Sequence, residues 1–119
     1  MTHEPIIRTS FSAWEHNDWE TIESLLADGF TFRSPDDDQI DKHAYKKKCW
    51  PGVEIIDTYD LVTIIEHGDE AFVRYPAHWH NGASFRVTEY MKFQDGKIKE
   101  IDGYWGFLPR NVEGMERFR

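Results

Sequence analysis

The spacing of hydrophobic residues in the first quarter of the chain is helical. Ile7, Phe11 and Trp14 recur at positions i, i+4 and i+7, which places them along one stripe of a helix. A second helical stripe runs through residues 17–29 (NDWETIESLLADG), where Gly29 is expected to end the helix. The pattern therefore predicts two short helices at the start of the fold.

Capping residues and a proline indicate where the next elements begin and end. Asn17 or Asp18 is expected to cap the second helix, and Asp41 to cap a third helix that follows it. Between these helices, residues 30–35 (FTFRSP) predict a short strand that Pro35 ends, because proline cannot donate to a sheet ladder. Three lysines close the third helix, where cations favour the helix dipole.

The pattern changes to strict alternation over residues 54–106, which predicts strands. Four long strands are expected, joined by turns at Gly68-Asp69, Asn81-Gly82 and Asp95-Gly96. Helices followed by an antiparallel meander predict an α+β fold, with the helices packed on one face of a curved sheet.

Composition adds a constraint on what the interior contains. The chain has 119 residues, which is expected to form one domain over residues 1–119, with residues 107–119 as a short terminal helix or a partner contact. Aromatic residues make up 15% of the chain and include five tryptophans. So many rings must fill a core or line a cavity.

Charge and cysteine content bear on partners and compartment. The formal net charge of −8, without a basic face, disfavours nucleic acid as a partner. No apolar run approaches the roughly 20 residues that span a bilayer, so no membrane partner is expected. A lone cysteine, Cys49, and an N-terminus without a signal-peptide pattern lead us to expect a cytoplasmic protein.

An acidic residue interrupts the apolar face of the third long strand. In residues 84–93 (SFRVTEYMKF), Glu89 lies on the same side as Val87 and Met91. A two-residue type I′ loop at Asp95-Gly96 would place this glutamate directly opposite Asp102. Two neighbouring carboxyls in an apolar setting cannot both ionise easily, so such a pair can act as a general acid or base near neutral pH.

The register of the preceding hairpin is open between two alternatives. A two-residue loop at Asn81-Gly82 would place Arg74 opposite Glu89 and make the glutamate half of a structural ion pair. A three-residue loop with a bulge would place Tyr75 opposite Glu89 instead. We favour the bulged register because it joins two apolar faces.

Six short strings, taken in their order, resemble those of a known superfamily: FTFRSP, DDDQID, KKCWPG, FRVTEY, DGKI and DGYWG. The chain resembles the nuclear transport factor 2-like superfamily and, within it, the SnoaL-like proteins. This resemblance implies a cone-shaped α+β barrel with a deep pocket, and a homodimer formed through the outer face of the sheet. Relatives such as ketosteroid isomerase, scytalone dehydratase, limonene epoxide hydrolase and polyketide cyclases use acid–base chemistry without a metal or organic cofactor.

Two positions depart from the patterns of these relatives. Ketosteroid isomerases have an aspartate before the proline that ends the first strand, where this chain has Ser34. Polyketide cyclases have an aspartate at the end of the last strand, where this chain has Gly106. Neither mechanism can therefore be carried over unchanged, and Glu89 with Asp102 is the acid pair typical of the closer branch.

The leading hypothesis is a cofactor-free acid–base enzyme of the isomerase, dehydratase or cyclase type, acting on a small, mostly apolar, oxygenated molecule. Glu89 and Asp102 would exchange the proton, and Tyr104 or Tyr75 would hydrogen-bond the substrate oxygen. The residues expected to pack the hydrocarbon are Trp14, Trp50, Tyr75, Trp79, Val87 and Met91. The alternatives are a non-catalytic ligand-binding protein and a dimerisation module.

Two polar clusters are expected to have ordinary roles. His78 and His80 share a strand face, but no third ligand is evident, so a metal site is not expected. The run Asp36, Asp37 and Asp38 is expected to form a solvated loop near the pocket mouth, with Asp37 or Asp38 acting as a cap or pairing with a lysine.

Overall fold

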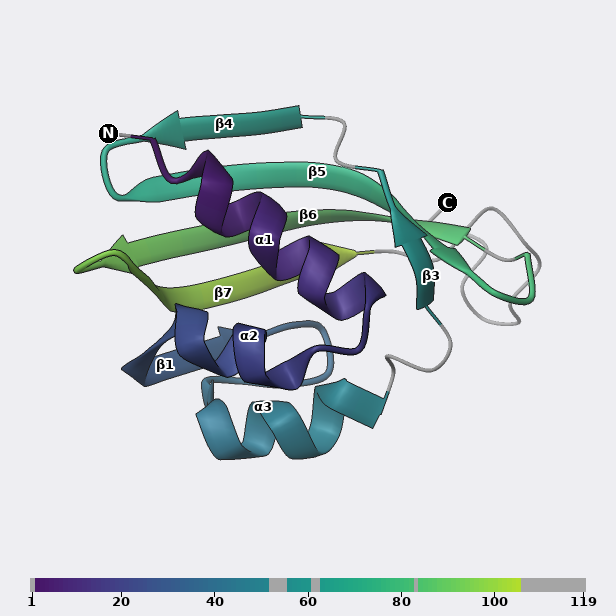
Figure 1. Cartoon of the computed structure of the whole chain (residues 1–119), viewed down its shortest axis with the longest axis horizontal. Coiled ribbons are helices and arrows are strands. Elements are labelled where there is room, and N and C mark those ends of the chain that lie inside the picture. The colour runs from purple at the N-terminus through teal and green to yellow at the C-terminus, as the bar shows by residue number, and fades with distance from the viewer. Residues whose placement is uncertain (1, 52–55, 61–62, 83, 106–119) are drawn as a thin grey trace.

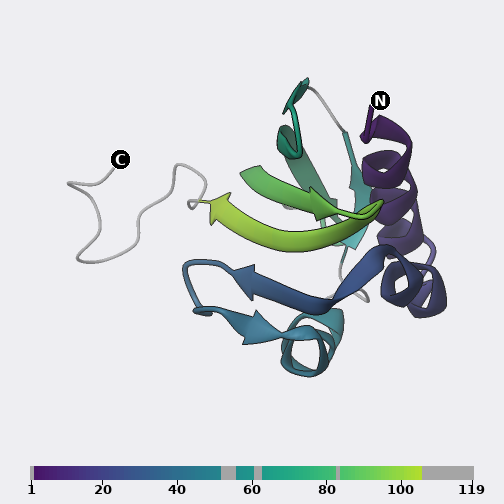
Figure 2. The same cartoon turned by 90° about the vertical axis from the view of Figure 1, so that its left-hand side faces the viewer.

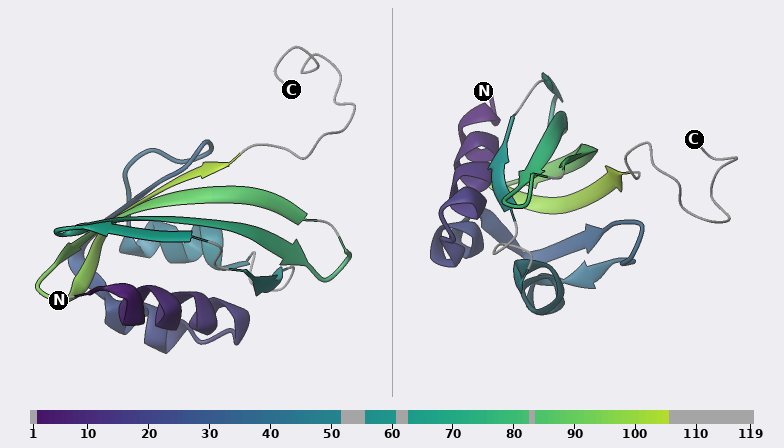
Figure 3. Two further views of the ribbon diagram at one scale, coloured as in Figure 1. Left: turned by 90° about the horizontal axis from the view of Figure 1, so that it is seen from above. Right: turned by 90° about the vertical axis from the view of Figure 1, so that its right-hand side faces the viewer.

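A computed structural model of the chain describes residues 2–51, 56–60, 63–82 and 84–105 (Figure 1). The terminal helix expected within residues 107–119 lies outside the described residues. Within them the elements are three helices and seven strands, which confirms the α+β class. The strands form one curved sheet, and α1 and α2 lie against one face of it (Figures 2 and 3).

The helices form where the stripes and caps predicted them. Helix α1 spans Glu4–Glu15, α2 spans Trp19–Leu25 and α3 spans Lys42–Cys49. The Asp18 carboxylate caps α2 by accepting a hydrogen bond of 3.1 Å from the backbone N–H of Thr21. The Asp41 carboxylate caps α3 in the same way, at 2.9 Å from the N–H of Ala44. No helix among the described residues is both long and apolar enough to cross a membrane.

The predicted end of α2 at Gly29 is wrong. The helix ends at Leu25, and strand β1 begins at once and spans Leu26–Arg33. Leu26 and Phe30 are both buried in this strand, so burial of two core side chains sets the boundary rather than the glycine. Gly29 lies inside β1, where its carbonyl accepts a hydrogen bond of 3.2 Å from Lys99 Nζ.

The sheet contains β1 and six further strands. These are β2 (Ile40–Asp41), β3 (Ile56–Tyr59), β4 (Thr63–His67), β5 (Glu70–Trp79), β6 (Ser84–Gln94) and β7 (Lys97–Trp105). Their order is β2-β1-β7-β6-β5-β3, and β4 also pairs with β5. Strands β4 to β7 form the expected antiparallel meander, whereas β1 pairs with β7 in parallel, so the sheet is mixed.

The first of the four expected long strands is divided in two. Strands β3 and β4 both pair with β5, β3 along its C-terminal end and β4 along its N-terminal end. In Figure 1, β3 lies beside the C-terminal end of α1 while β4 forms the edge of the sheet. This division brings Tyr59, the last residue of β3, beneath α1, where its ring lies 5.2 Å from that of Phe11.

A bulge in β7 changes the predicted register of the last hairpin. Asp95 and Gly96 have φ angles of 52° and 77°, and Phe93 pairs with Ile98, as the two-residue type I′ loop requires. The register then shifts by one residue, because Lys92 pairs with Glu100 and Lys99 is the extra residue. The predicted pairing of Glu89 with Asp102 is therefore wrong: Glu89 faces Gly103, and Asp102 faces Tyr90.

The hairpin between β5 and β6 has the predicted faces but neither predicted register. Val73 pairs with Glu89, and Tyr75 pairs with Val87. The favoured alternative is correct in placing Tyr75 on the same face as Glu89, although one pair further along the ladder. The ion-pair alternative is wrong, since Arg74 faces Thr88 on the opposite side of the sheet.

Candidate functional site: an acidic residue in an aromatic cavity

A cavity of about 450 Å³ lies between the inner face of the sheet and the helices. All three helices contribute to its wall, together with strands β1, β3, β5, β6 and β7. Most of the lining is aromatic or aliphatic. The charged residues in the lining are Asp36, Asp37, Lys48 and Glu89.

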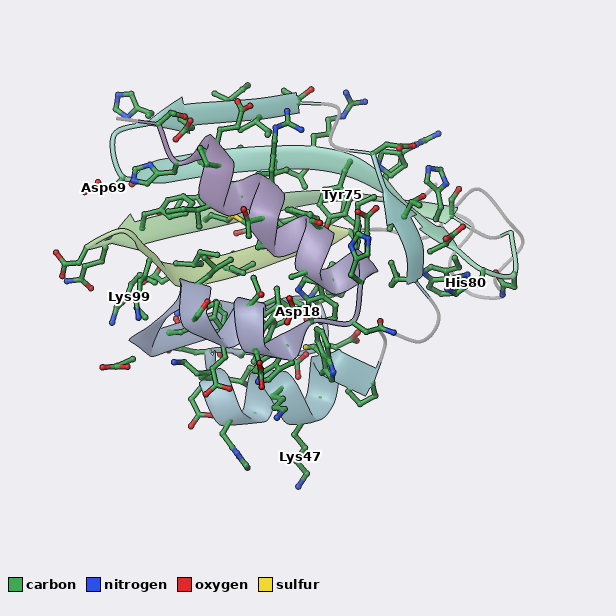
Figure 4. All side chains as sticks on the ribbon, viewed as in Figure 1. Asp18, Lys47, Asp69, Tyr75, His80 and Lys99 are labelled. Atoms are coloured by element: carbon green, nitrogen blue, oxygen red, sulfur yellow. The ribbon has the colours of Figure 1, made fainter. Side chains whose placement is uncertain are left out.

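Glu89 reaches the cavity from the middle of β6. Its carboxylate accepts a short hydrogen bond from the phenol O–H of Tyr75 on the neighbouring strand. Tyr75 points into the space between α1 and the sheet (Figure 4), where its ring lies 4.8 Å from that of Phe11. Glu89 keeps a partial exposure because it lines the cavity, while protein atoms surround it on its other sides. The carboxyl is thus held at a fixed place in an apolar interior.

Burial controls the proton affinity of this carboxyl. It raises the pKa of Glu89 from 4.5 to about 7, because an apolar surrounding disfavours the charged form. The hydrogen bond from Tyr75 acts in the opposite direction and lowers the pKa, since it stabilises the carboxylate. Glu89 can therefore both accept and give up a proton near neutral pH.

Three tyrosine side chains surround the glutamate, and their hydroxyl groups stay protonated. Burial, followed by the negative charge of Glu89, raises the pKa of Tyr45, Tyr59 and Tyr75 above the ordinary value for a phenol. The rings of Tyr59 and Tyr75 meet edge to face, with their centroids 5.4 Å apart. All three hydroxyls therefore keep their protons at the pH where Glu89 titrates, and Tyr75 donates its hydrogen bond to Glu89 itself.

A second group of charged residues lies in the loop after β1 and at the end of α3. Lys48 Nζ lies 3.3 Å from Asp37 Oδ1, and only 12% of the Asp37 side chain is exposed. The Ser34 hydroxyl accepts hydrogen bonds from the N–H groups of Asp36 and Asp37, which folds this loop back on itself. The expected pairing of an aspartate with a lysine is confirmed for Asp37.

Five of the six residues expected to pack a ligand line the cavity: Trp14, Tyr75, Trp79, Val87 and Met91. Trp50, the sixth, is not part of the lining. Its ring packs 4.8 Å from that of Trp14 and 5.2 Å from that of Trp19, so it supports Trp14 from behind. Cys49 does line the cavity, but burial raises the pKa of its thiol to about 12, so it stays protonated.

Asp102 and Tyr104 lie on the outer face of the sheet, away from the cavity. The bulge at Lys99 directs both side chains to the outer face, and Tyr104 is 59% exposed. Asp102 instead lies 4.0 Å from the Arg33 guanidinium. Partial burial raises the pKa of Asp102, and the Arg33 charge partly offsets this effect. The proposal that these two residues act together with Glu89 is therefore wrong.

Sequence reasoning missed Tyr45, Tyr59 and Trp105 as lining residues. A signal for the last of these was present, because Ile98 and Ile101 are three residues apart and cannot both face the same side of a regular strand. Only a bulge between them satisfies both, and it also turns Trp105 inward. Tyr59 gave no such signal, since its orientation depends on where the expected strand is divided into β3 and β4.

Gly103 gives Trp105 the space it occupies. A Cβ atom at Gly103 would lie 2.7 Å from Cζ3 of Trp105, closer than carbon atoms can approach. We expect Gly103→Ala to destabilise the protein by about 1–3 kcal/mol in urea unfolding and to displace the indole from the cavity wall. In a Trp105→Leu background the same substitution is expected to have a smaller effect. Equal effects in both backgrounds would show that the ring does not set this requirement.

The two histidines pair with aspartates near the C-terminal end of β5. His78 Nε2 lies 2.8 Å from Asp60 Oδ2, and His80 Nδ1 lies 3.8 Å from Asp57 Oδ1. In the described part of the chain, no three His, Cys, Asp or Glu side chains are grouped so as to hold a metal ion.

Comparison with known families identifies the class of protein to which the fold and cavity correspond. The family model described as SnoaL-like domain matches residues 7–101, and the chain belongs to this family. A search of curated proteins found no match.

Solved structures with the same fold include proteins with different described activities. An NTF2-like protein of unknown function from Cytophaga hutchinsonii is 17% identical, with a TM-score of 0.73 over 89% of this chain and 91% of that one. A putative ketosteroid isomerase from Kribbella flavida is 16% identical, with a TM-score of 0.76 over 98% and 87%. An LEH-like epoxide hydrolase from M. tuberculosis is 14% identical, with a TM-score of 0.70 over 84% and 79%. These likenesses show the NTF2-like fold.

Proposed function

We propose that this chain is an acid–base enzyme, without metal or organic cofactor, that acts on a small, mostly apolar, oxygenated molecule in the cavity. The proposal rests on the Glu89 carboxyl, which faces an aromatic cavity and has a pKa raised to about 7. Its ionised form would take a proton from substrate carbon or oxygen, and its protonated form would return one. Isomerisation, dehydration and cyclisation are all compatible with such a group.

The surrounding residues have complementary roles in this proposal. Tyr75 holds the Glu89 carboxylate through its O–H, so it positions the base. Tyr59, which feels the charge of Glu89 and stays protonated, would donate a hydrogen bond to the substrate oxygen. Trp14, Trp79 and Met91 would pack the hydrocarbon. Solved proteins of the same fold that are named as a putative ketosteroid isomerase and an epoxide hydrolase support an enzymatic role.

A small activated probe tests for a usable base. In 5-nitrobenzisoxazole, a base removes the ring C–H proton while the N–O bond breaks, and the product is a coloured cyanophenolate. We expect the protein to accelerate this reaction, with a rate that rises with pH and levels off above about pH 7, where Glu89 is ionised. Glu89→Gln is expected to lower the protein-dependent rate by about 100-fold or more, the usual contribution of a positioned base.

Glu20→Gln is the matched control, because Glu20 is exposed on α2 and the substitution removes the same charge. It is expected to retain the full rate. Binding of the probe without acceleration would contradict the enzymatic role and favour the non-catalytic alternative, a ligand-binding protein. Equal rates in the wild-type and Glu89→Gln proteins would show that another group is the base.

The outer face of the sheet supports the proposal of a homodimer. Ile65, Phe72, Tyr90 and Asp102 form a row of paired residues across four strands. Ile65 and Phe72 are 60% and 47% exposed, and the ring of Phe72 packs 5.4 Å from that of Tyr90. Exposed apolar side chains in contiguous rows are typical of surfaces that another protein covers, and the family resemblance indicates a second copy of this chain.

Sedimentation equilibrium at micromolar concentration tests the dimer. We expect the wild-type protein to sediment with twice the monomer mass and Phe72→Lys to shift the equilibrium to monomer, because a buried lysine without a partner is unfavourable. Glu20→Gln should leave the mass unchanged. A monomeric wild-type protein would contradict the proposed interface.

A further inference from the structure

The charges around the cavity are predominantly negative. Three of the four charged residues in its lining are acidic, and Lys48 is the single basic one among the described residues. The Lys48 ammonium is already paired with Asp37 at 3.3 Å, so its charge is compensated. The protein as a whole carries a formal charge of −8. An anionic ligand would therefore meet repulsion both at a distance and inside the cavity.

Glu89 lacks a positively charged neighbour within the described part of the chain. Burial and the Tyr75 hydrogen bond account for its pKa, and no lysine, arginine or histidine contributes. The groups that face it are the phenols of Tyr75 on β5, Tyr59 on β3 and Tyr45 on α3, followed by the Cys49 thiol. A buried carboxylate usually has a cationic or metal partner.

We propose that the ligand supplies this positive charge: the cavity selects a small apolar molecule that carries a basic nitrogen beside its oxygen function. The protonated amine would donate a hydrogen bond to the Glu89 carboxylate in the wall of the cavity. The oxygen function would remain next to the Tyr59 hydroxyl. This inference rests on the ligand binding assumed in the proposed function, and not on catalysis.

The aromatic lining suits such a ligand. The rings of Phe11, Tyr59 and Tyr75 meet pairwise at 73–81° with centroids 4.8–5.4 Å apart, so they form one packed aromatic cluster in the wall of the cavity. An ammonium group near such rings gains attraction from their π electrons, and more so where water is excluded. The apolar body of the ligand would occupy the rest of the cavity, whose total volume is about 450 Å³.

Three naphthalene probes of nearly equal size test the inference: 2-naphthylmethylamine, 2-naphthalenemethanol and 2-naphthoate. Calorimetry with the full chain should show the amine binding at least about 10-fold more tightly than the alcohol at neutral pH, and the carboxylate more weakly than either. In Glu89→Gln the amine and the alcohol should bind about equally. The Glu20→Gln control should keep the preference of the wild-type protein.

Proton release provides an independent readout of the same contact. A cation beside Glu89 favours its ionised form, so binding of the amine at pH 7 should release about half a proton, the fraction that the free carboxyl retains. Calorimetry in two buffers of different ionisation enthalpy measures this number. The affinity for the amine should rise between about pH 6 and pH 8, whereas the affinity for the alcohol should stay constant.

The outcomes separate this inference from the proposed function. If the alcohol binds as tightly as the amine, or no proton is released, the charge selection is wrong while the cavity remains a binding site. If none of the three probes binds, both proposals fail. If a carboxyl-carbon NMR titration gives Glu89 a pKa below about 4.5 in the free protein, a positive charge of the protein already faces it, and the inference is overturned.

Discussion

Replacing Glu89 with glutamine is expected to stabilise the protein by about 3 kcal/mol at pH 8 and to leave its stability nearly unchanged at pH 4. The pKa of this carboxyl is about 7 in the folded protein and 4.5 when it is exposed, a difference that corresponds to about 3 kcal/mol. Burying the charged form opposes folding by this amount. Glutamine has the same shape and can still accept the hydrogen bond from Tyr75, but it carries no charge.

The pH dependence follows from the direction of the shift. Below pH 4.5 the carboxyl is protonated in both the folded and the unfolded protein, so burial has no effect on ionisation. Between pH 4.5 and about 7 the unfolded chain loses this proton while the folded protein keeps it, so stability falls as pH rises. Above about pH 7 both states are ionised, and the full penalty applies.

Urea unfolding of both proteins at pH 4 and pH 8 measures this difference. The difference between the free energies of unfolding of the two proteins cancels the contributions of all other titrating groups. Glu20→Gln should show no such stabilisation, because Glu20 is an exposed acid in the first turn of α2 and favours the helix dipole. If Glu89→Gln instead destabilises the protein at pH 8, the carboxylate has a favourable partner, and its assignment as a base would be withdrawn.

Local signals in the sequence were sufficient for the starts of two helices and for one hairpin turn. Asp18 and Asp41 cap helices as predicted, and Asp95-Gly96 forms the predicted turn. Each of these features depends on backbone hydrogen bonds or φ angles within a few residues. The start of β1 at Leu26 is different, because burial against distant elements overrides the glycine that follows it.

The candidate site was only partly predictable, because side-chain direction in a strand depends on every residue before it. The single extra residue at Lys99 moves Asp102 and Tyr104 to the outer face and brings Trp105 into the cavity. Glu89 was identified correctly as a residue of the inner face, since its own strand alternates without interruption. Its partners lie on other strands and depend on long-range register, which a regular pattern could not give.

The contact between α3 and β1 depends on Tyr45, a residue of the cavity lining. Tyr45 is 5% exposed, and its ring lies 5.0 Å from that of Phe30 and 4.8 Å from that of Phe32. The same ring lies 6.1 Å from that of Trp14 on α1. In the structure Tyr45 therefore joins α3 to the sheet and to α1.

We therefore expect Tyr45→Ala to lower the free energy of unfolding by about 3–5 kcal/mol, the usual loss when a large buried aromatic side chain is removed. Tyr45→Phe keeps the ring and is expected to lose less than about 1.5 kcal/mol. Urea unfolding at pH 6 measures both. A loss below about 1 kcal/mol for the alanine variant would mean that α3 does not depend on this contact. A large loss confined to the alanine variant would show that ring packing, rather than the hydroxyl, is the contribution of Tyr45 to stability.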